Sequence, residues 1–331
     1  TPDRLKISDK PVECCPIDVM QDGLEEDRLA DRKFGSTRRG IAPVYADKYM
    51  KKAIRMGDLL HPQYLRERLE TIVDWKNLML KGMYDFDGYT VDELVAWFDT
   101  YGKPLIPYIC DVSTYLDNAL AEGKNVMLEA QLGALRDIDF GIYPYTTSSS
   151  TITAYGPVGA GIPWRKVDAA VGVMKAYSTC VGEGPFTAEM FGEEGENLRK
   201  AGGEYGAATG RPRRVGGFDV VASRYGVKMQ GATEIALTKL DVLDNLAKIP
   251  VCVAYEVDGV RVDNFPSGEA LNKAKPVIEY LDGWQTSTAD CRKYEDLPEN
   301  ARKYIEFLEK SVGCYIKYIS VGAERDAIII K

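Results

Sequence analysis

Histidine is almost absent from this sequence of 331 residues, in which His61 is the only one. A mechanism that needs a histidine as acid or base would have to use His61 or a group outside the chain. Its place directly before Pro62 favours a position at a helix start. The seven cysteines include no Cys-x-x-Cys pair, so a zinc site of cysteine and histidine is not expected. Their odd number favours reduced thiols and a cytoplasmic protein.

Long apolar runs and an excess of basic residues are also missing. No stretch of about 18 apolar residues occurs, so no membrane-spanning segment is expected. The opening sequence TPDRLKISDK has no apolar stretch behind basic residues and does not resemble a signal peptide. The formal net charge is −8, whereas surfaces that bind nucleic acid normally carry a basic excess. We therefore expect neither a membrane nor nucleic acid as a partner.

Apolar periodicity alternates between helical and strand-like segments along the chain. Helices are predicted over 62–82, from the capping box at Thr90 onward, over 218–230 and over 299–312. Strands are predicted over 125–130, 172–181, 235–240 and 314–322, with a hairpin over 251–262 around an Asp-Gly turn. Strands separated by helices indicate an α/β fold with a mainly parallel central sheet flanked by helices. No linker or repeat interrupts the pattern, so we expect a single α/β domain over residues 1–331.

Polar or glycine-rich segments follow four of the predicted strands: QLGALRDIDFG, GEGPF, KLD and VGAER. Ligands of open α/β sheets gather at the carboxyl ends of the strands. The four segments favour a crevice of nucleotide size, although glycines after strands are common in α/β proteins.

The segment TKLD, residues 238–241, ends an apolar strand with one charge of each sign. One carboxylate can accept both N1–H and the exocyclic N2–H of guanine, a pair of donors that adenine does not offer. The stem of a lysine two residues earlier can lie along the base. Lys239 and Asp241 therefore fit a guanine-reading pair. They fit equally well a charged strand end that is salt-bridged to its own neighbour.

Two further segments indicate anion binding. GGEYGAATGRPRRVGG, residues 202–217, combines six glycines with three arginines, which suits a loop that closes over an anionic small molecule. The alternative is a solvated surface loop. In the segment that begins at FGSTRRG, Ser36 and Thr37 offer hydroxyls and backbone amides beside two arginines, as a phosphate site would. The alternative there is a helix cap with a basic face.

A specific resemblance rests on five segments in one order and at one consistent spacing: GSTRRGIAPVYADK, DIDFGIYPYTTSSS, KAYSTCVGEGPF, GAATGRPRR and LTKLDVLD. Together they resemble the adenylosuccinate synthetase family, GTP-dependent ligases that join IMP to L-aspartate in the AMP branch of purine biosynthesis. The resemblance covers nearly the whole chain. It implies a P-loop-NTPase-like α/β fold, a reaction through 6-phosphoryl-IMP, Mg²⁺ as cofactor, and a cytoplasmic homodimer.

The resemblance also assigns roles to individual residues. The positions implied for IMP are Thr37, Lys51, Gln131, Thr147, Val181 and Arg211. The positions implied for L-aspartate are Thr209 and Arg211. Those implied for GTP are Arg213, Lys239, Asp241, Ser320 and Gly322.

Two of these positions depart from the family pattern. EAQLG, residues 129–133, stands where the family has EGAQG, so the IMP-binding glutamine aligns with Leu132 and Gln131 lies one place earlier. Either the backbone shifts to bring Gln131 inward or the contact is lost. Gln131 is the one catalytic candidate. Lys51 stands where the family sends an arginine to the partner's IMP phosphate, which keeps the charge and loses the bidentate fork.

A glycine-rich phosphate loop is the largest difference from the family. Family members open with a strand and GDEGKGK, whose aspartate is general base and magnesium ligand, and a nearby histidine acts as acid. This sequence has no such loop and no G-x-x-x-x-G-K-[ST] motif. We therefore expect a fragment without the first strand, without metal ligands of its own, and inactive alone. It is either a piece of a normal ligase, which the retained substrate-recognition residues favour, or a non-catalytic nucleotide-binding relative.

Overall fold

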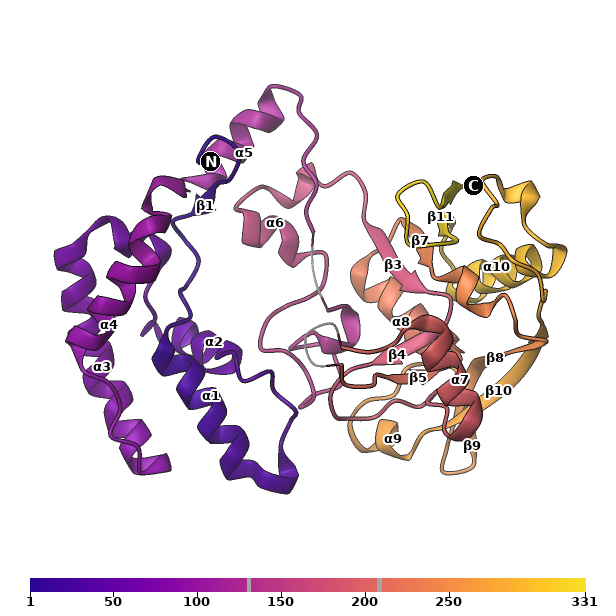
Figure 1. Ribbon diagram of the computed structural model, residues 1–331, viewed down its shortest axis with the longest axis horizontal. Coiled ribbons are helices and arrows are strands. Elements are labelled where there is room, and N and C mark those ends of the chain that lie inside the picture. The colour runs from indigo at the N-terminus through magenta and orange to yellow at the C-terminus, as the bar shows by residue number, and fades with distance from the viewer. Residues whose placement is uncertain (130–131, 207–209) are drawn as a thin grey trace. The chain divides into compact units, whose positions relative to one another are not determined.

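The computed structural model describes residues 1–129, 132–206 and 210–331 (Figure 1). Internal contacts divide the chain into two compact units. Unit 1 comprises Thr1–Gln131, Asp137–Asp139 and Pro144–Lys166, and unit 2 comprises Leu132–Arg136, Phe140–Tyr143 and Val167–Lys331. The single domain over residues 1–331 stays a prediction. None of the described helices is long and apolar enough to cross a membrane.

Unit 1 consists mainly of helices: α1 (Pro16–Leu29), α2 (Ile41–Met50), α3 (Pro62–Tyr84), α4 (Val91–Trp97), α5 (Val112–Ala121) and α6 (Tyr155–Ala160). Its strands β1 (Ile7–Ser8) and β2 (Ile109–Cys110) form a short parallel pair. Helix α3 confirms the prediction over 62–82, because it begins directly after His61 and buries Leu65, Leu69 and Ile72 on one face. The predicted capping box of Thr90 and Glu93 begins α4.

A buried ion cluster joins three helices of unit 1. Lys76 of α3 is 1% exposed, and its Nζ lies 2.8 Å from Asp18 Oδ1 of α1 and 2.5 Å from Asp47 Oδ2 of α2. Burial raises the pKa of the Asp47 carboxyl to about 6, although Lys76 opposes the shift. Because one ammonium serves both carboxylates, the cluster fixes α1 and α2 to α3.

Unit 2 contains a four-stranded sheet in the order β12–β11–β7–β3. Its strands are β3 (Val171–Lys175), β7 (Glu234–Thr238), β11 (Ile316–Ser320) and β12 (Ile328–Ile330). The first three run parallel, and β12 pairs antiparallel with β11 at the edge. The core of the unit packs Ile235 and Leu237 of β7 with Ile305 and Leu308 of α10 (Glu299–Val312). These elements confirm the α/β class and its mainly parallel central sheet.

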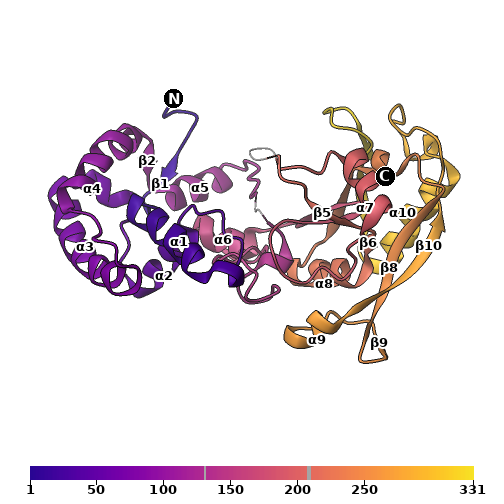
Figure 2. The ribbon, with the colours of Figure 1, turned by 60° about the horizontal axis from the view of Figure 1, so that its bottom comes forward.

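A second sheet of unit 2 is organised around β8 (Lys248–Val257). Strand β10 (Lys275–Asp282) pairs antiparallel with it along its length, as the paired ribbons in Figure 2 show, and β6 (Phe218–Asp219) pairs in parallel on the other side. Strand β9 (Val260–Val262) completes the predicted hairpin with β8. Its turn residues Asp258 and Gly259 have φ angles of 51° and 81°, the left-handed conformation that such tight hairpin turns require.

Three helices and two short strands complete unit 2: α7 (Gly192–Gly202), α8 (Val220–Gln230), α9 (Gly268–Lys273), β4 (Ser178–Cys180) and β5 (Arg214–Gly216). Helix α8 and helix α10 confirm the helices predicted over 218–230 and 299–312, and β6 takes the first two residues of the former range. Strands β7 and β11 confirm the strands predicted over 235–240 and 314–322.

Two predicted strands differ from the structure. Residues 125–129 form no strand, and they pair with no other described residue. Met127 is 88% exposed. A run of apolar residues does not by itself supply the hydrogen-bonding partner that a strand needs. The segment 172–181 is two strands instead of one. Strand β3 pairs with β7, the chain leaves the sheet at Ala176 and Tyr177, and β4 then pairs with β5. The break is fixed because Ala176 donates its N–H to Thr238 and accepts a hydrogen bond from Tyr304.

Candidate functional site

The carboxyl ends of three parallel strands meet at one edge of the main sheet of unit 2. Lys175 of β3 pairs with Thr238 of β7, and Leu237 pairs with Ile319 of β11, one residue before Ser320. Residues that follow these strand ends are therefore neighbours, although they are more than 60 positions apart in the sequence. Ligands of open α/β sheets bind at such an edge.

The TKLD segment lies at this edge. Strand β7 ends at Thr238, and Lys239 adopts a left-handed φ of 60° that turns the chain into a short 3-10 helix, Leu240–Leu243. The Lys239 Nζ donates to Gly202 O at 2.6 Å and lies 3.2 Å from Glu204 Oε1. Among the described residues it forms no ion pair with Asp241. The alternative of a salt bridge within TKLD is therefore wrong, because Lys239 finds its partner in another segment.

The two aspartates of LTKLDVLD have different environments. Asp244 is buried and accepts three hydrogen bonds, from Trp284 Nε1 and from the N–H and hydroxyl of Thr288. Asp241 is partly exposed and, within the described part of the chain, accepts from no other side chain. Burial raises the pKa of its carboxyl, and the neighbouring Asp244 adds to the shift. Asp241 is thus the carboxylate at this edge that can still accept ligand donors.

Ser320 and Gly322 shape the end of β11. The Ser320 hydroxyl donates to Gly322 O at 2.9 Å, and the intervening Val321 is buried and donates its N–H to Ala327 O. A Cβ at position 322 would lie 3.1 Å from the Ala327 Cβ, a tight contact. Glycine there keeps the turn close against the strand end that neighbours β7.

Glu204 is the centre of a polar cluster beside this edge. Its side chain is fully buried. Its Oε1 accepts hydrogen bonds from Lys175 Nζ at 2.8 Å and from the Tyr177 hydroxyl at 2.5 Å, and its Oε2 accepts one from Arg213 at 2.9 Å. Lys239 is the fourth donor. Burial raises the pKa of the Glu204 carboxyl, but these hydrogen bonds outweigh burial and lower it to about 2. One carboxylate therefore faces three cations.

The segment 202–217 starts and ends in this cluster. Its base is closed by a bridge between Tyr205 and Pro212 and by the Arg213 N–H, which donates to Glu204 O at 2.9 Å. Arg211 is 70% exposed, and its guanidinium lies 3.9 Å from Glu183. The Arg213 Nε is buried and, among described groups, has no hydrogen-bond partner. Thr209 lies outside the described residues.

Val181 follows β4 in the STCVGEGPF segment. Its side chain is 66% exposed, and its carbonyl accepts a 2.5 Å hydrogen bond from Arg136. Arg214 of β5 braces the same segment, because it donates to Gly184 O at 2.8 Å and pairs with Glu189. The backbone around Val181 is therefore held by two arginines of unit 2.

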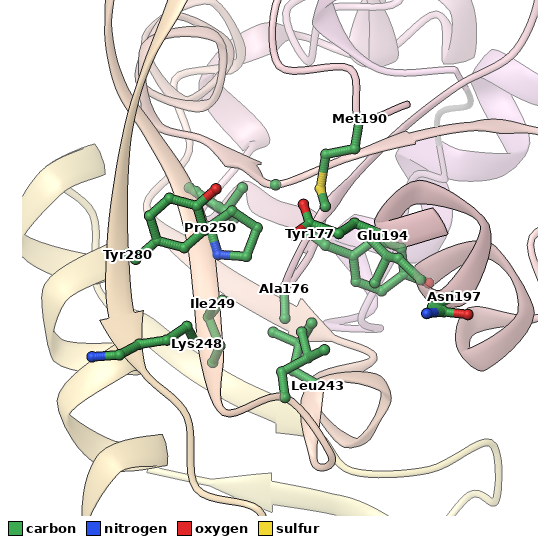
Figure 3. A pocket seen from close by; sticks show the side chains of 14 residues that line it. Ala176, Tyr177, Met190, Glu194, Asn197, Leu243, Lys248, Ile249, Pro250 and Tyr280 are labelled. Atoms are coloured by element: carbon green, nitrogen blue, oxygen red, sulfur yellow. The ribbon is translucent and has the colours of Figure 1, made fainter. Parts of the chain in front are cut away.

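A small cavity lies against Tyr177 in unit 2 (Figure 3). Its volume is about 180 Å³, and its lining is largely apolar, with Met190, Leu243 and Pro250 around it. Ligand pockets usually reach about 300–1,000 Å³, so this cavity is too small for a nucleotide. The Tyr177 ring lines the cavity while its hydroxyl serves Glu204.

Thr37 lies in a loop of unit 1 that two carboxylates of α1 hold. Asp22 accepts from the Ser36 hydroxyl at 2.7 Å and from Gly40 N at 2.9 Å, and Glu26 accepts from the amides of Phe34 and Gly35. The Ser36 hydroxyl is therefore already used, whereas Thr37 is exposed. A Cβ at Gly40 would lie 2.7 Å from Cys14 Sγ and 2.8 Å from Val19 N, so the loop ends tightly against α1.

Lys51 and Thr147 also belong to unit 1. Lys51 ends α2 with a left-handed φ of 63° and is exposed, and Arg68 donates to its carbonyl. Of the neighbouring cations, Lys48 donates to the Tyr155 hydroxyl at 3.2 Å, and Lys52 lies over the Trp75 ring. Lys51 is thus an exposed cation, and no aromatic ring of the described residues stacks on it. Thr147 is partly exposed, and Gln131 lies outside the described residues.

Comparison with known proteins places the chain in one family. The adenylosuccinate synthetase family profile matches residues 1–329. The adenylosuccinate synthetase of Dehalococcoides mccartyi is 44% identical over 327 residues, which are 98% of this chain and 77% of the relative. The one from Caldanaerobacter subterraneus subsp. tengcongensis is 42% identical, over 99% of this chain and 77% of the relative.

A solved structure supports the same family assignment. The structure of fully ligated adenylosuccinate synthetase from Plasmodium falciparum matches with a TM-score of 0.93 at 34% identity, and the match covers 100% of this chain and 78% of that one. The chain belongs to the adenylosuccinate synthetase family. The family prediction made from the five segments is confirmed.

Three residues of this adenylosuccinate synthetase family member were missed by the sequence reasoning: Lys175, Tyr177 and Glu204. They are polar groups in or beside apolar strands and a glycine-rich loop, and nothing in their spacing links them. The sequence did contain one indication of Lys175, because this lysine interrupts an apolar segment in the same way as Lys239 does. The residues predicted for GTP all lie in unit 2, whereas those predicted for IMP divide between unit 1 and unit 2.

Proposed function

We propose that this member of the adenylosuccinate synthetase family is a ligase that uses GTP to join IMP and L-aspartate into adenylosuccinate. The observation that carries the proposal is the convergence of Lys239, Asp241 and Ser320 at one edge of the sheet. The family relation supports the ligase over the non-catalytic relative, since matched proteins carry the synthetase name.

Asp241 reads guanine in this proposal. Its carboxylate accepts N1–H and N2–H together, and both bonds are charge-assisted. The base is confined by the turn of Ser320 and Gly322. Lys239 is anchored at its ammonium by Glu204, which leaves its apolar stem to lie along the base. The buried Nε of Arg213 has no hydrogen-bond partner among the described groups, and an acceptor on the nucleotide would provide one.

The remaining assignments follow the family pattern. Thr37, Thr147 and Lys51 bind the IMP phosphate, Lys51 from the other subunit of a symmetric homodimer. Val181 contacts the ribose through its backbone, and Arg211 contacts ribose and the incoming aspartate. Thr209 and Gln131 keep their proposed contacts to aspartate and IMP. The exposure of Arg211, Lys51 and Thr37 supports these roles, because each is accessible to a ligand.

The chemistry consists of two displacements. N1 of IMP loses its proton, O6 takes the γ-phosphoryl group of GTP, and GDP leaves. The aspartate amine then attacks C6, the C6–O bond breaks, phosphate leaves, and the new C–N bond remains. Positioning and charge stabilisation dominate such phosphoryl transfer, which suits a site rich in Lys and Arg.

Magnesium is the cofactor that the family implies. Among the residues that the structure describes, no group of three or more histidine, cysteine, aspartate or glutamate side chains could hold a metal ion. No described side chain is therefore assigned to magnesium. We place the protein in the cytoplasm, which its seven free thiols support.

The test is phosphate release from GTP in the presence of IMP, L-aspartate and magnesium. The chain spans 77% of the Dehalococcoides mccartyi relative, so release is measured for the chain alone and with the part of that relative that it does not span added. We expect phosphate release when the added part is present, and we expect that release to stop when IMP or aspartate is omitted. Release that ATP supports as well as GTP would contradict the guanine assignment. GTP binding without release in either arm would favour the non-catalytic relative.

A further inference from the structure

Arg136 is a cation of unit 2 to which the sequence patterns assign no role. It ends a short 3-10 turn, Ala134–Arg136, and its guanidinium reaches the segment that follows β4. One amino group donates to Val181 O at 2.5 Å and to Cys180 Sγ at 3.1 Å, and the other donates to Glu183 O at 3.4 Å. The planar fork of donors therefore holds three successive groups of that segment at once.

The turn that carries Arg136 packs on helix α8. Ala134 is buried, and its Cβ would lie only 3.7 Å from a Cβ at Gly226, so a glycine of α8 lets the turn approach closely. Tyr225 of the same helix donates its hydroxyl to Phe140 O at 2.6 Å. Arg136 therefore extends from a supported part of unit 2.

The Val181 carbonyl needs support from outside its own segment. Strand β4 ends at Cys180, and beyond it Gly182 and Gly184 have left-handed φ angles of 84° and 101°. Glycine restricts the backbone less than other residues do, so the segment itself does little to fix the direction of its carbonyls. A Cβ at Gly182 would lie 3.8 Å from the Arg136 Nη2, which places the guanidinium directly against this glycine.

A carbonyl that Arg136 holds can still serve a ligand. A carbonyl oxygen has two lone pairs, so Arg136 occupies one and the other can accept a ribose hydroxyl. The Cys180 thiol lies 3.8 Å from the same oxygen and is only a weak donor. A carbonyl that is oriented before the ligand arrives binds it more tightly, because the cost of ordering the backbone no longer opposes binding.

We propose that Arg136 is a positioning residue of the IMP site and sets its preference for an intact ribose: it orients the Val181 carbonyl towards a ribose hydroxyl. The inference rests on the proposed function, which gives the Val181 backbone its ribose contact. Arg136 acts through this carbonyl and not on IMP itself. Its loss therefore weakens the hydroxyl contact, while the contacts of the phosphate remain.

The experiment measures the affinities of IMP, 2′-deoxy-IMP and 3′-deoxy-IMP by titration calorimetry. The wild type should bind IMP about 3- to 10-fold more tightly than the analogue that lacks the contacted hydroxyl, as expected for one neutral hydrogen bond. Arg136→Met should weaken IMP by about the same factor and leave that analogue nearly unchanged, so the preference falls towards one. Arg136→Lys keeps the charge without the fork, so its preference should be intermediate.

The matched control is Arg224→Met. Arg224 of α8 also donates to a backbone carbonyl, Ser311 O at 2.9 Å, but away from the segment after β4, so its loss should leave the preference unchanged. Should Arg136→Met fail to fold, as circular dichroism would report, the lowered preference of Arg136→Lys provides the test.

Two results would count against the inference in different ways. A folded Arg136→Met variant that keeps the wild-type preference, even if it binds all three nucleotides more weakly, would overturn the inference alone. Equal wild-type affinities for IMP and both analogues would contradict the ribose contact of the proposed function and the inference together.

Discussion

Removal of the buried ammonium of Lys76 should destabilise unit 1 strongly. In Lys76→Met, the carboxylates of Asp18 and Asp47 lose the group that lies 2.8 Å and 2.5 Å from them. Breaking a buried ion pair by removing one partner costs about 3–5 kcal/mol, because the remaining charge is left without compensation. Asp18 keeps a hydrogen bond from the Cys15 N–H, so most of the cost falls on Asp47.

The cost should depend on pH in a defined direction. The folded-state pKa of Asp47, about 6, lies above its ordinary value of 3.8. The stability that this group contributes is therefore fully present below about pH 4 and is lost as the pH rises through 6. At pH 5 Asp47 is largely protonated in the wild type and depends less on Lys76. We expect the loss in Lys76→Met to be larger at pH 7.5 than at pH 5.

Urea unfolding at the two pH values measures both effects. The matched control is Lys81→Met in the same helix, where the ammonium pairs with Asp85 and Asp87 but the side chain is 56% exposed. Exposed pairs contribute about 0–1 kcal/mol, so this variant should unfold nearly as the wild type does. A Lys76→Met variant that matches Lys81→Met, or a loss that does not change with pH, would refute the reasoning.

Three further predictions concern other parts of the chain. Burial raises the pKa of Asp219 to about 6, so its stabilising contribution is lost as the pH rises from 4 through 6. In urea unfolding, the stability difference between Asp219→Asn and the wild type should therefore shift by about 2 kcal/mol in favour of the variant from pH 4.5 to pH 7.5, and parallel pH profiles would contradict this. Hydrogen exchange at Gly206, whose N–H donates to Arg211 O at 2.8 Å, should slow when IMP, aspartate and GDP are added together, because a ligand bound at Arg211 stabilises that hydrogen bond; equal exchange with and without the ligands would contradict ligand binding at Arg211. In the active enzyme, Lys51→Ala and Thr147→Ala should each abolish turnover, and mixing the two variants should restore it. One site of the heterodimer then combines Thr147 of one subunit with Lys51 of the other, and no recovery would count against a contribution of Lys51 to the other subunit.

Local sequence patterns predicted the helices and turns that neighbouring residues determine. Helix α3 follows from its apolar period and from His61 and Pro62 at its start, and the β8–β9 hairpin follows from Asp258 and Gly259. The strand predicted over 125–130 failed over its described residues because a strand depends on a partner, and composition does not show where a partner lies.

The site was only partly predictable, because several of its contacts join residues that are far apart in the sequence. The family motifs pointed to Lys239 and Asp241 because both lie in one short segment. The role of Glu204 depends on contacts with Lys175 and Lys239, which are 29 and 35 positions away in the sequence. The split of β3 and β4 around Tyr177 likewise depends on pairing with separate strands. Long-range contacts of this kind leave no periodic signal.

Nucleotide preference of an Asp241→Asn variant tests the guanine assignment most directly. An amide can accept at one atom and donate at the other, so it loses the paired N1–H and N2–H contact of guanine and gains a donor for the 2-oxo group of xanthine. Loss of the charge-assisted contact should weaken GTP by roughly 1.5–3 kcal/mol, or about 10- to 150-fold.

Competition binding of GTP and XTP to the wild type and the variant provides the measurement. Asp244→Asn is the control, because that carboxylate serves Trp284 and Thr288 inside the protein and its loss should lower stability without changing the preference. We predict that Asp241→Asn shifts the preference from GTP towards XTP. An unchanged preference in a folded Asp241→Asn variant would contradict the account.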